Sequence, residues 1–132
     1  MPPKLDVVNP ETLAPAVGYS HGIKGTGEIL FVGGQIGWDQ SGTVVSDDFV
    51  AQFVQALDNV LEVVWKAGGR PESIARMTVY VTDREEYGAA RKAIGAAWKQ
   101  RLGRHYPAMA LVQVAALLEP GAKVEIEATA IL

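Results

Sequence analysis

The 132-residue sequence predicts an α/β (α+β) fold in which a mixed sheet of about six strands carries two helices on one face. Two observations lead to this prediction. Alternating, β-branched segments occur before, between and after two segments whose apolar residues repeat at helical spacing. No internal repeat or low-complexity linker interrupts the chain, so residues 1–132 are expected to form a single domain.

The amino-terminal half is expected to contain two strands and the first helix. Residues 1–27 are rich in proline and glycine and predict a loop with one short strand over residues 19–24. Residues 28–36 (EILFVGGQI) predict a longer strand, followed by a short hairpin arm over residues 38–45. Adjacent glycines in a strand, here Gly33 and Gly34, indicate a bulge or a place where a ligand approaches the backbone.

Both predicted helices carry start and stop signals. Residues 46–48 (SDD) supply a cap for the first helix, and Gly68 with Gly69 ends it. Asp83 caps the second helix, and Gly103 ends it. The residues expected on the two buried faces are Phe49, Phe53, Leu57, Val60, Leu61 and Val64 in the first helix, and Tyr87, Ala90, Ile94, Ala97 and Trp98 in the second.

Residues 74–82, 108–117 and 123–131 predict three further strands, the last two joined by a type II turn around Pro120-Gly121. Both faces of the segment 108–117 (AMALVQVAAL) are mostly apolar, so both should be covered. Two helices cover only one face of a sheet. A second copy of the chain is the simplest cover for the other face.

Composition excludes several classes of function. The chain has no cysteine, which excludes disulfides and thiolate chemistry and favours the cytoplasm. A net charge of -3 without a basic run argues against nucleic acid as a partner. No apolar run is long enough to cross a membrane, and residues 1–6 lack the apolar core of a signal peptide. With two separated histidines and no nucleotide-binding loop, we expect neither a metal nor an organic cofactor.

Three segments of the chain resemble the RidA (YjgF) family, which is also called the endoribonuclease L-PSP family. Residues 18–22 (GYSHG) resemble the family's Gly-Pro-Tyr-Ser-Gln stretch, and residues 33–36 (GGQI) resemble its Ser-Gly-Gln-Ile. Residues 106–109 (YPAM), 112–115 (VQVA) and 124–128 (VEIEA) follow its final strand pair. Each motif is weak alone, but their order and spacing along nearly the whole chain identify it as a member.

The resemblance implies a chorismate-mutase-like fold and a homotrimer with three small-molecule pockets between subunits. The best-understood members hydrolyse reactive imines and enamines, which arise from pyridoxal-phosphate enzymes, to keto acids and ammonia. In those members an arginine that follows Pro-Ala binds the substrate carboxylate with both arms of its guanidinium group. The residue at that position here is Met109.

Matching positions also transfer the expected pocket residues. Tyr19, Gly34, Gln35 and Glu125 occupy positions that correspond to the family's pocket, with Glu125 as the candidate catalytic group. Gly33 stands where a serine is common.

The other two departures make the predicted pocket floor more apolar. Leu111 stands where a cysteine is frequent, and Met109 has no hydrogen-bond donor. A charged hydrogen bond contributes roughly 1.5–3 kcal/mol, so loss of the arginine predicts carboxylate binding weaker by a factor of about ten or more. Arg91, Arg104 and His105 are the candidates that could replace the missing positive charge, or they are ordinary solvated side chains.

Ordinary structural roles stand beside the functional ones. Strand alternation places Glu125 and Glu127 on one face, where they are either solvated or, if a partner covers that face, able to position a water. Met109 either lines a pocket or fills a subunit interface. Tyr19 is either a hydrogen-bonding pocket residue or a half-buried aromatic residue.

Two functions from different classes therefore stay open. The first is hydrolysis of a small imine, enamine or related metabolite without the usual carboxylate anchor. The second is a ligand-binding or interaction trimer that has lost the chemistry, which Met109 favours. A ribonuclease or translation-inhibitor role is disfavoured by the acidic charge and the lack of a basic stripe lined with aromatic residues.

Overall fold

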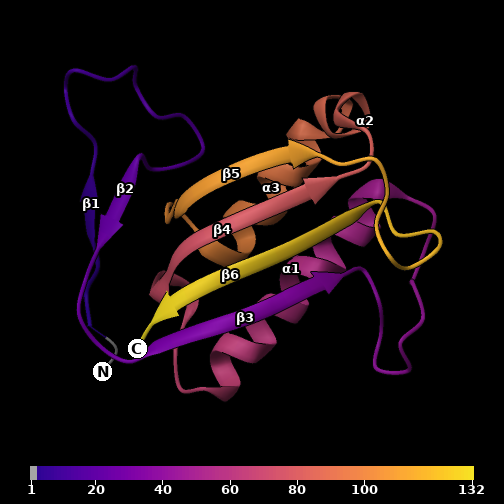
Figure 1. Cartoon of the computed structure of the whole chain (residues 1–132), viewed down its shortest axis with the longest axis horizontal. Coiled ribbons are helices and arrows are strands. Elements are labelled where there is room, and N and C mark those ends of the chain that lie inside the picture. Colours follow the sequence, from indigo (N-terminus) through magenta and orange to yellow (C-terminus); the bar gives the residue numbers. More distant parts are fainter. Residues whose placement is uncertain (1–2) are drawn as a thin grey trace.

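The computed structural model describes residues 3–132 and is an α+β structure, as predicted (Figure 1). Its elements in chain order are β1 (Asp6–Val8), β2 (Gly22–Lys24), β3 (Ile29–Ile36), α1 (Phe49–Lys66), a 3₁₀ turn (Pro71–Ser73), β4 (Ile74–Val81), α2 (Arg84–Ala89), α3 (Arg91–Leu102), β5 (Ala108–Gln113) and β6 (Val124–Ile131).

Four strands form the main sheet in the order β3-β6-β4-β5. Strand β6 is antiparallel to both of its neighbours, whereas β4 and β5 are parallel. Residues 3–132 contain six strands, but β1 and β2 form a separate two-stranded sheet, which corrects the expectation of one sheet. The strand predicted over residues 19–24 is shorter than expected, and its partner β1 lies in a segment predicted to be loop.

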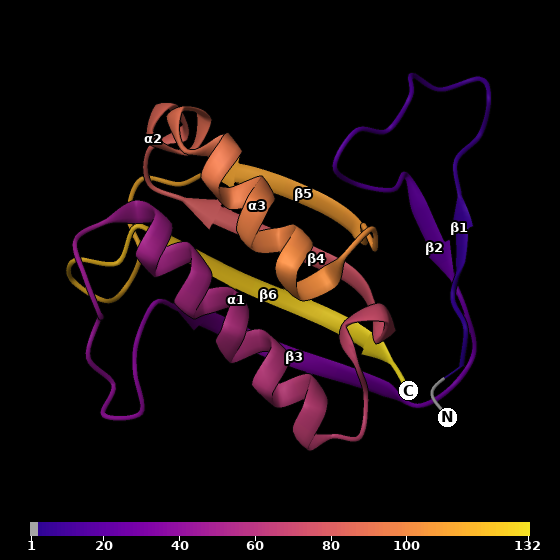
Figure 2. The same ribbon diagram turned by 180° about the vertical axis from the view of Figure 1, so that it is seen from behind.

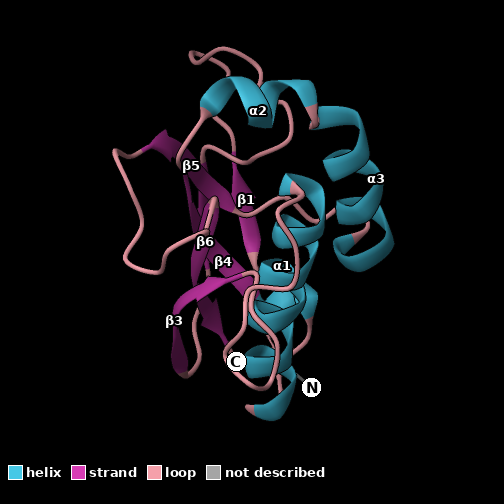
Figure 3. Cartoon of the chain, turned by 90° about the vertical axis from the view of Figure 1, so that its right-hand side faces the viewer, coloured by secondary structure: helices cyan, strands magenta, loops and turns pink. Residues whose placement is uncertain are grey.

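The helices lie on one face of the main sheet, and the other face is left open (Figures 2 and 3). The strands place alternate residues in the core: Val124, Ile126 and Ala130 of β6 are fully buried beneath the helices. The predicted apolar face of α1 is buried along its whole length. Burying a side chain of this size contributes about 1.5–3 kcal/mol, so this face makes a large contribution to stability.

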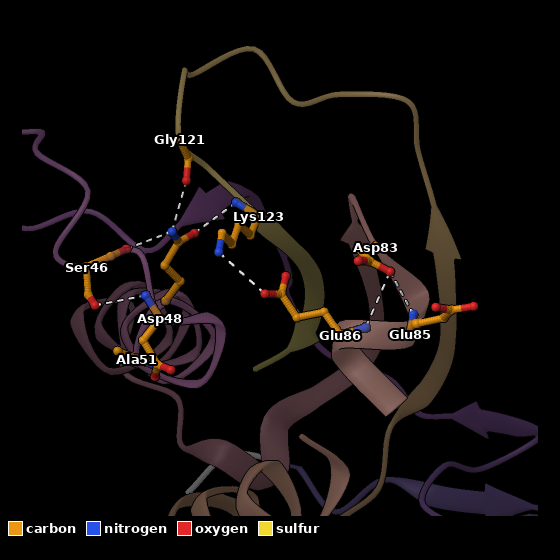
Figure 4. Close-up of polar contacts among 9 residues, drawn as sticks. Ser46, Asp48, Ala51, Asp83, Glu85, Glu86, Gly121 and Lys123 are labelled. Atoms are coloured by element: carbon orange, nitrogen blue, oxygen red, sulfur yellow. Dashed lines mark hydrogen bonds and ion pairs between the residues drawn. The ribbon is translucent and has the colours of Figure 1, made fainter. Parts of the chain in front are cut away.

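The predicted helix caps are confirmed (Figure 4). Asp48 accepts a hydrogen bond from the Ala51 N–H at 2.9 Å, and Asp83 accepts one from the Glu85 N–H at 2.9 Å. The second helix, however, is broken at Ala90 into α2 and α3. Gly88, a poor helix former just before the break, is the one local signal of it.

The carboxy-terminal strands differ from the prediction in extent and pairing. β5 ends at Gln113 rather than at residue 117, and β4 lies between β5 and β6. The two last strands are therefore not neighbours. The turn before β6 is confirmed: Gly121 has φ +85°, and the Ala122 N–H donates to the Glu119 carbonyl at 3.1 Å.

A buried amide ties α1 to the beginning of β6. The side chain of Gln52 is 0% exposed, and its Nε2 donates to the carbonyls of Ser46 at 2.8 Å and Gly121 at 2.9 Å. Its Oε1 accepts from the Lys123 N–H at 2.8 Å. The backbone groups of both connecting loops are thus satisfied by one side chain; Figure 4 places Ser46, Gly121 and Lys123 around it.

Replacing Gln52 with alanine is expected to destabilise the protein. The change leaves two carbonyls and one N–H without partners, which should lower the free energy of unfolding by about 2–4 kcal/mol. Gln55→Ala is the matched control, because Gln55 bonds only the Asn59 side chain on the same helix. Urea denaturation at equal protein concentration measures both variants, and equal losses would contradict the role given to Gln52.

Candidate functional site

The bulge predicted at the paired glycines is present in β3. The pairing register between β3 and β6 shifts between Val32 and Gln35, so one extra residue is accommodated there. A Cβ atom at Gly34 would collide with the Glu125 carboxylate, whereas a Cβ at Gly33 would meet nothing within 4 Å. Gly34 therefore lets the Glu125 carboxylate lie directly against the backbone of β3.

Glu125 lies on the open face of the sheet and is half-buried. Tyr80 is its cross-strand neighbour on β4, and the Tyr80 hydroxyl donates to Oε1 of Glu127 at 2.6 Å. This hydrogen bond, together with desolvation and the two nearby carboxylates, raises the pKa of Tyr80 above its ordinary value. Tyr80 therefore keeps its proton at neutral pH and donates it in the hydrogen bond to Glu127. The Glu125 carboxylate has no hydrogen bond from another residue within residues 3–132.

Met109 and Leu111 lie on the opposite face of the sheet from Glu125. They pair in register with Met77 and Val79 of β4, whose side chains are buried beneath the helices. Together with residues of α1, α2 and α3 they line a cavity of about 290 Å³. An adjoining hollow extends this cavity to Tyr19, so three of the predicted pocket residues meet here.

The cavity is mainly apolar but has a cationic side chain in its wall. Arg91, the first residue of α3, lines both parts of the cavity with Tyr87 of α2. Arg104 is not among the lining residues, and His105 is engaged elsewhere, with its Nε2 2.7 Å from the Ile74 carbonyl oxygen. Of the three candidates for the missing charge, the structure places only Arg91 beside Met109.

Sequence reasoning missed two aromatic residues as parts of the cavity. Tyr87 and Trp98 were expected only on a buried helix face, yet both line the cavity. The Trp98 ring is stacked with that of Tyr106, with centroids 6.4 Å apart, and its Nε1 donates to the His105 carbonyl at 3.1 Å.

The predicted site residues therefore form two separate groups within one chain. Gly33, Gly34, Gln35 and Glu125 lie at the β3 edge of the sheet, whereas Met109 and Leu111 lie on β5 at the other edge. With strands about 4.8 Å apart, the two edge strands of a four-stranded sheet are separated by roughly 14 Å. The two groups do not line a common cavity.

Neither a metal-binding cluster nor a membrane-spanning helix is found among residues 3–132. Within residues 3–132, no three His, Cys, Asp or Glu side chains are grouped so that they could hold a metal ion. None of the described helices combines the length and the apolar character needed to cross a bilayer.

Comparison with known proteins agrees with this architecture. Residues 10–132 match the family model described as Endoribonuclease L-PSP. The human 2-iminobutanoate/2-iminopropanoate deaminase is 35% identical over 103 residues, which cover 77% of this chain and 72% of the relative. A RutC family protein of Haemophilus influenzae is 30% identical over 125 residues, 95% of each chain.

Solved structures give the same result. YyfB from Yersinia pestis, a Rid family protein of unknown function, has a TM-score of 0.86 and 36% identity, with 98% of this chain and 99% of that chain covered. Escherichia coli TdcF with bound serine has a TM-score of 0.71 and 29% identity, with 96% and 98% covered. The chain belongs to the endoribonuclease L-PSP family, known also as the RidA or YjgF family.

Gly34→Ala is expected to displace the Glu125 carboxylate and to lower the free energy of unfolding by about 1 kcal/mol, at the low end for overpacking because a carboxylate can rotate away. Gly33→Ala is the matched control, since its Cβ would enter open space. Urea denaturation and crystal structures of both variants test this. An unmoved Glu125 in the Gly34 variant would contradict the close approach.

Proposed function

We propose that the protein binds a small imine, enamine or related metabolite in pockets formed between copies of the chain, and that it is a poor hydrolase of 2-imino acids. The observation that carries the second part is the side chain of Met109, which faces an apolar cavity at the position of the family's carboxylate-binding arginine. Relatives named for 2-imino acid hydrolysis, and TdcF with bound serine, support a small-metabolite ligand.

The separation of the two residue groups supports a pocket shared by two copies. Glu125 and Gly34 lie near one edge of the sheet, and Met109 lies at the other. A head-to-tail arrangement brings unlike edges of neighbouring copies together and closes into a ring. A homotrimer would then contain three equivalent pockets, each with a β3 edge from one copy and a β5 edge from the next.

A ring of three predicts a single assembly of three chains in solution. Light scattering at micromolar concentration is expected to give three times the 14.1 kDa mass of the chain. A stable monomer would reject the shared pocket, because neither group of residues forms the whole site alone.

The groups at the β3 edge fit the needs of imine hydrolysis. Water adds to the imine carbon while a base takes a proton from it and the imine nitrogen gains one, which gives a carbinolamine. Transfer of the remaining hydroxyl proton to nitrogen then breaks the C–N bond, releases ammonia and leaves a carbonyl. Glu125, which has no hydrogen-bond partner in the described chain, is assigned the positioning of that water. Backbone N–H groups near Gly34 are assigned the stabilisation of developing negative charge.

The Met109 cavity determines which substrates are accepted. A 2-imino acid needs its carboxylate held while water attacks the adjacent carbon, so the anchor contributes to rate as well as affinity. Met109 and Leu111 supply no donor, and Arg91 is the one cation that lines the described cavity. The preferred ligand therefore carries an apolar group at Met109 and, at most, one acidic group within reach of Arg91.

Little hydrolysis of 2-imino acids is expected from the natural protein, and a gain is expected in Met109→Arg. The imine is generated with an amino-acid oxidase, and its decay is followed with and without each protein. Restoring a bidentate anchor should raise kcat/KM by about tenfold or more. Met77→Leu is the control for a change of a buried methionine on the neighbouring strand.

A natural rate equal to that of arginine-bearing relatives would overturn the claim. Arg91→Gln then shows whether Arg91 supplies the anchor, because the rate should fall only if it does. The second candidate function, a binding trimer without turnover, is favoured by the same methionine. Saturable ligand binding by calorimetry without product formation would decide for it.

A further inference from the structure

Within residues 3–132, the outer edge of β3 and one edge of β2 have no strand beside them. Strand β3 is at the border of the main sheet, and its outer edge carries no strand within residues 3–132. Strand β2 pairs with β1 on one side and has its other edge free. Residues 25–28 connect β2 to β3, a length typical of β-hairpins, yet the two strands do not pair.

The connection turns the chain away from β3. Gly27 has φ +152°, and a Cβ there would collide with the Leu132 carbonyl oxygen. The beginning of β3 is fixed by two hydrogen bonds between Glu28 and Leu132, of 2.9 and 2.8 Å. The amino-terminal arm, defined here as residues 6–24, consequently stands off the end of the main sheet (Figures 1 and 2).

The arm is hydrogen-bonded to the chain just before β5, at the edge of the main sheet opposite β3. The Ser20 N–H donates to the Pro107 carbonyl at 3.0 Å, and the Ser20 hydroxyl donates to the Tyr106 carbonyl at 2.6 Å. Ser20 also bridges to Ala108, the first residue of β5. These contacts place Tyr19 at the cavity that contains Met109.

Both unpaired elements are apolar and exposed. Phe31 and Ile29 of β3 are 77% and 62% exposed, and Val17 and Val7 of the arm are 78% and 55% exposed. A two-stranded ribbon with three residue pairs is marginal by itself, and an uncovered apolar edge strand is a site for pairing with another chain. Both features indicate a missing strand partner.

We propose that the arm of each copy pairs through β2 with the β3 edge of the next copy. This rests on the proposed pocket between copies and assigns the segment that builds it. The partner of the β3 edge is the β2 strand of a second copy of this chain. The short connection between β2 and β3 allows one antiparallel register for this strand pair, and that register can form between two copies as well as within one. In this register Lys24 lies opposite Ile29 and Gly22 opposite Phe31. Ser20 and Tyr19 lie beyond the paired residues, because the Ser20 N–H stays bonded to the Pro107 carbonyl of its own chain.

The exchange would join the two halves of the candidate site. Tyr19 remains beside Met109 of its own chain, and the pairing of Gly22 with Phe31 brings it toward Gly34, and hence toward Glu125, of the neighbour. Pairing of β2 with β3 of the same chain would instead require the arm to leave β5 and to break both Ser20 hydrogen bonds. Each copy gives one arm and receives one, as in a closed ring.

The chain has no cysteine, which allows a direct test. Gly22→Cys is introduced into a copy with an enlarging tag and Phe31→Cys into an untagged copy. The two are co-expressed, then oxidised or treated with a short bismaleimide. Gly22 tolerates a side chain, since its Cβ would meet only Val8 atoms at 3.5 and 3.6 Å. A covalent heterodimer on a denaturing gel is expected, because only exchange between copies brings these residues together.

Two comparisons keep the result specific. Ser41→Cys replaces Gly22→Cys as the control, because Ser41 is exposed in a loop outside the arm, and no heterodimer is expected with Phe31→Cys. The double variant Gly22→Cys, Phe31→Cys in one chain should give cross-linked multimers. If Gly22→Cys fails to fold, Lys24→Cys with Ile29→Cys tests the same register.

The outcomes separate the arm from the function. A double variant that closes its cross-link within one chain, or the absence of any heterodimer, overturns arm exchange even if the protein binds an imine-like ligand. A heterodimer in a protein that binds no such ligand supports the exchange and rejects the proposed function instead. Neither readout depends on substrate.

Discussion

The helices cover one face of the four-stranded sheet, and this one-sided burial organises the rest of the molecule. Alternate residues of the two central strands, β4 and β6, are buried beneath the helices, which fixes the register of these strands and the face on which each of their side chains lies. The same alternation forces Glu125, Glu127 and Tyr80 onto the open face. The polar part of the candidate site is therefore a direct consequence of how the core is packed.

Strand order then separates the polar group from the apolar one. With β3 and β5 at the two borders, Gly34 and Met109 cannot face each other within one chain. The pocket proposed between copies would link the stability of the assembly to ligand binding. A ligand bound between two subunits would stabilise the assembly by an amount that rises with the logarithm of its concentration relative to Kd.

Met109 bears on the proposed ligand and leaves the family's fold unchanged. The Met109 side chain packs partly against the core and covers apolar surface there. A guanidinium group at this position would leave that surface exposed. Arg91 approaches from α3 rather than from the sheet, as a single side chain at the wall of the cavity. The family is shared with proteins named as imine deaminases, and a shared fold does not by itself fix the chemistry of the site.

Local signals in the sequence determined α1 with its buried face, the two N-caps at Asp48 and Asp83, and the bulge at Gly33-Gly34, because hydrogen bonds and periodicity over a few residues carry that information. They did not show the break at Ala90 between α2 and α3. The family motifs determined the candidate residues. Pairing partners of strands lie far apart in sequence, so the order β3-β6-β4-β5, the separate β1–β2 sheet and the place of the arm were decided only by the tertiary structure. The position of Arg91 was also decided only by the tertiary structure. A charge on the polar face of a helix does not indicate which strand lies opposite, and the placement of α3 beside β5 brings Arg91 next to Met109.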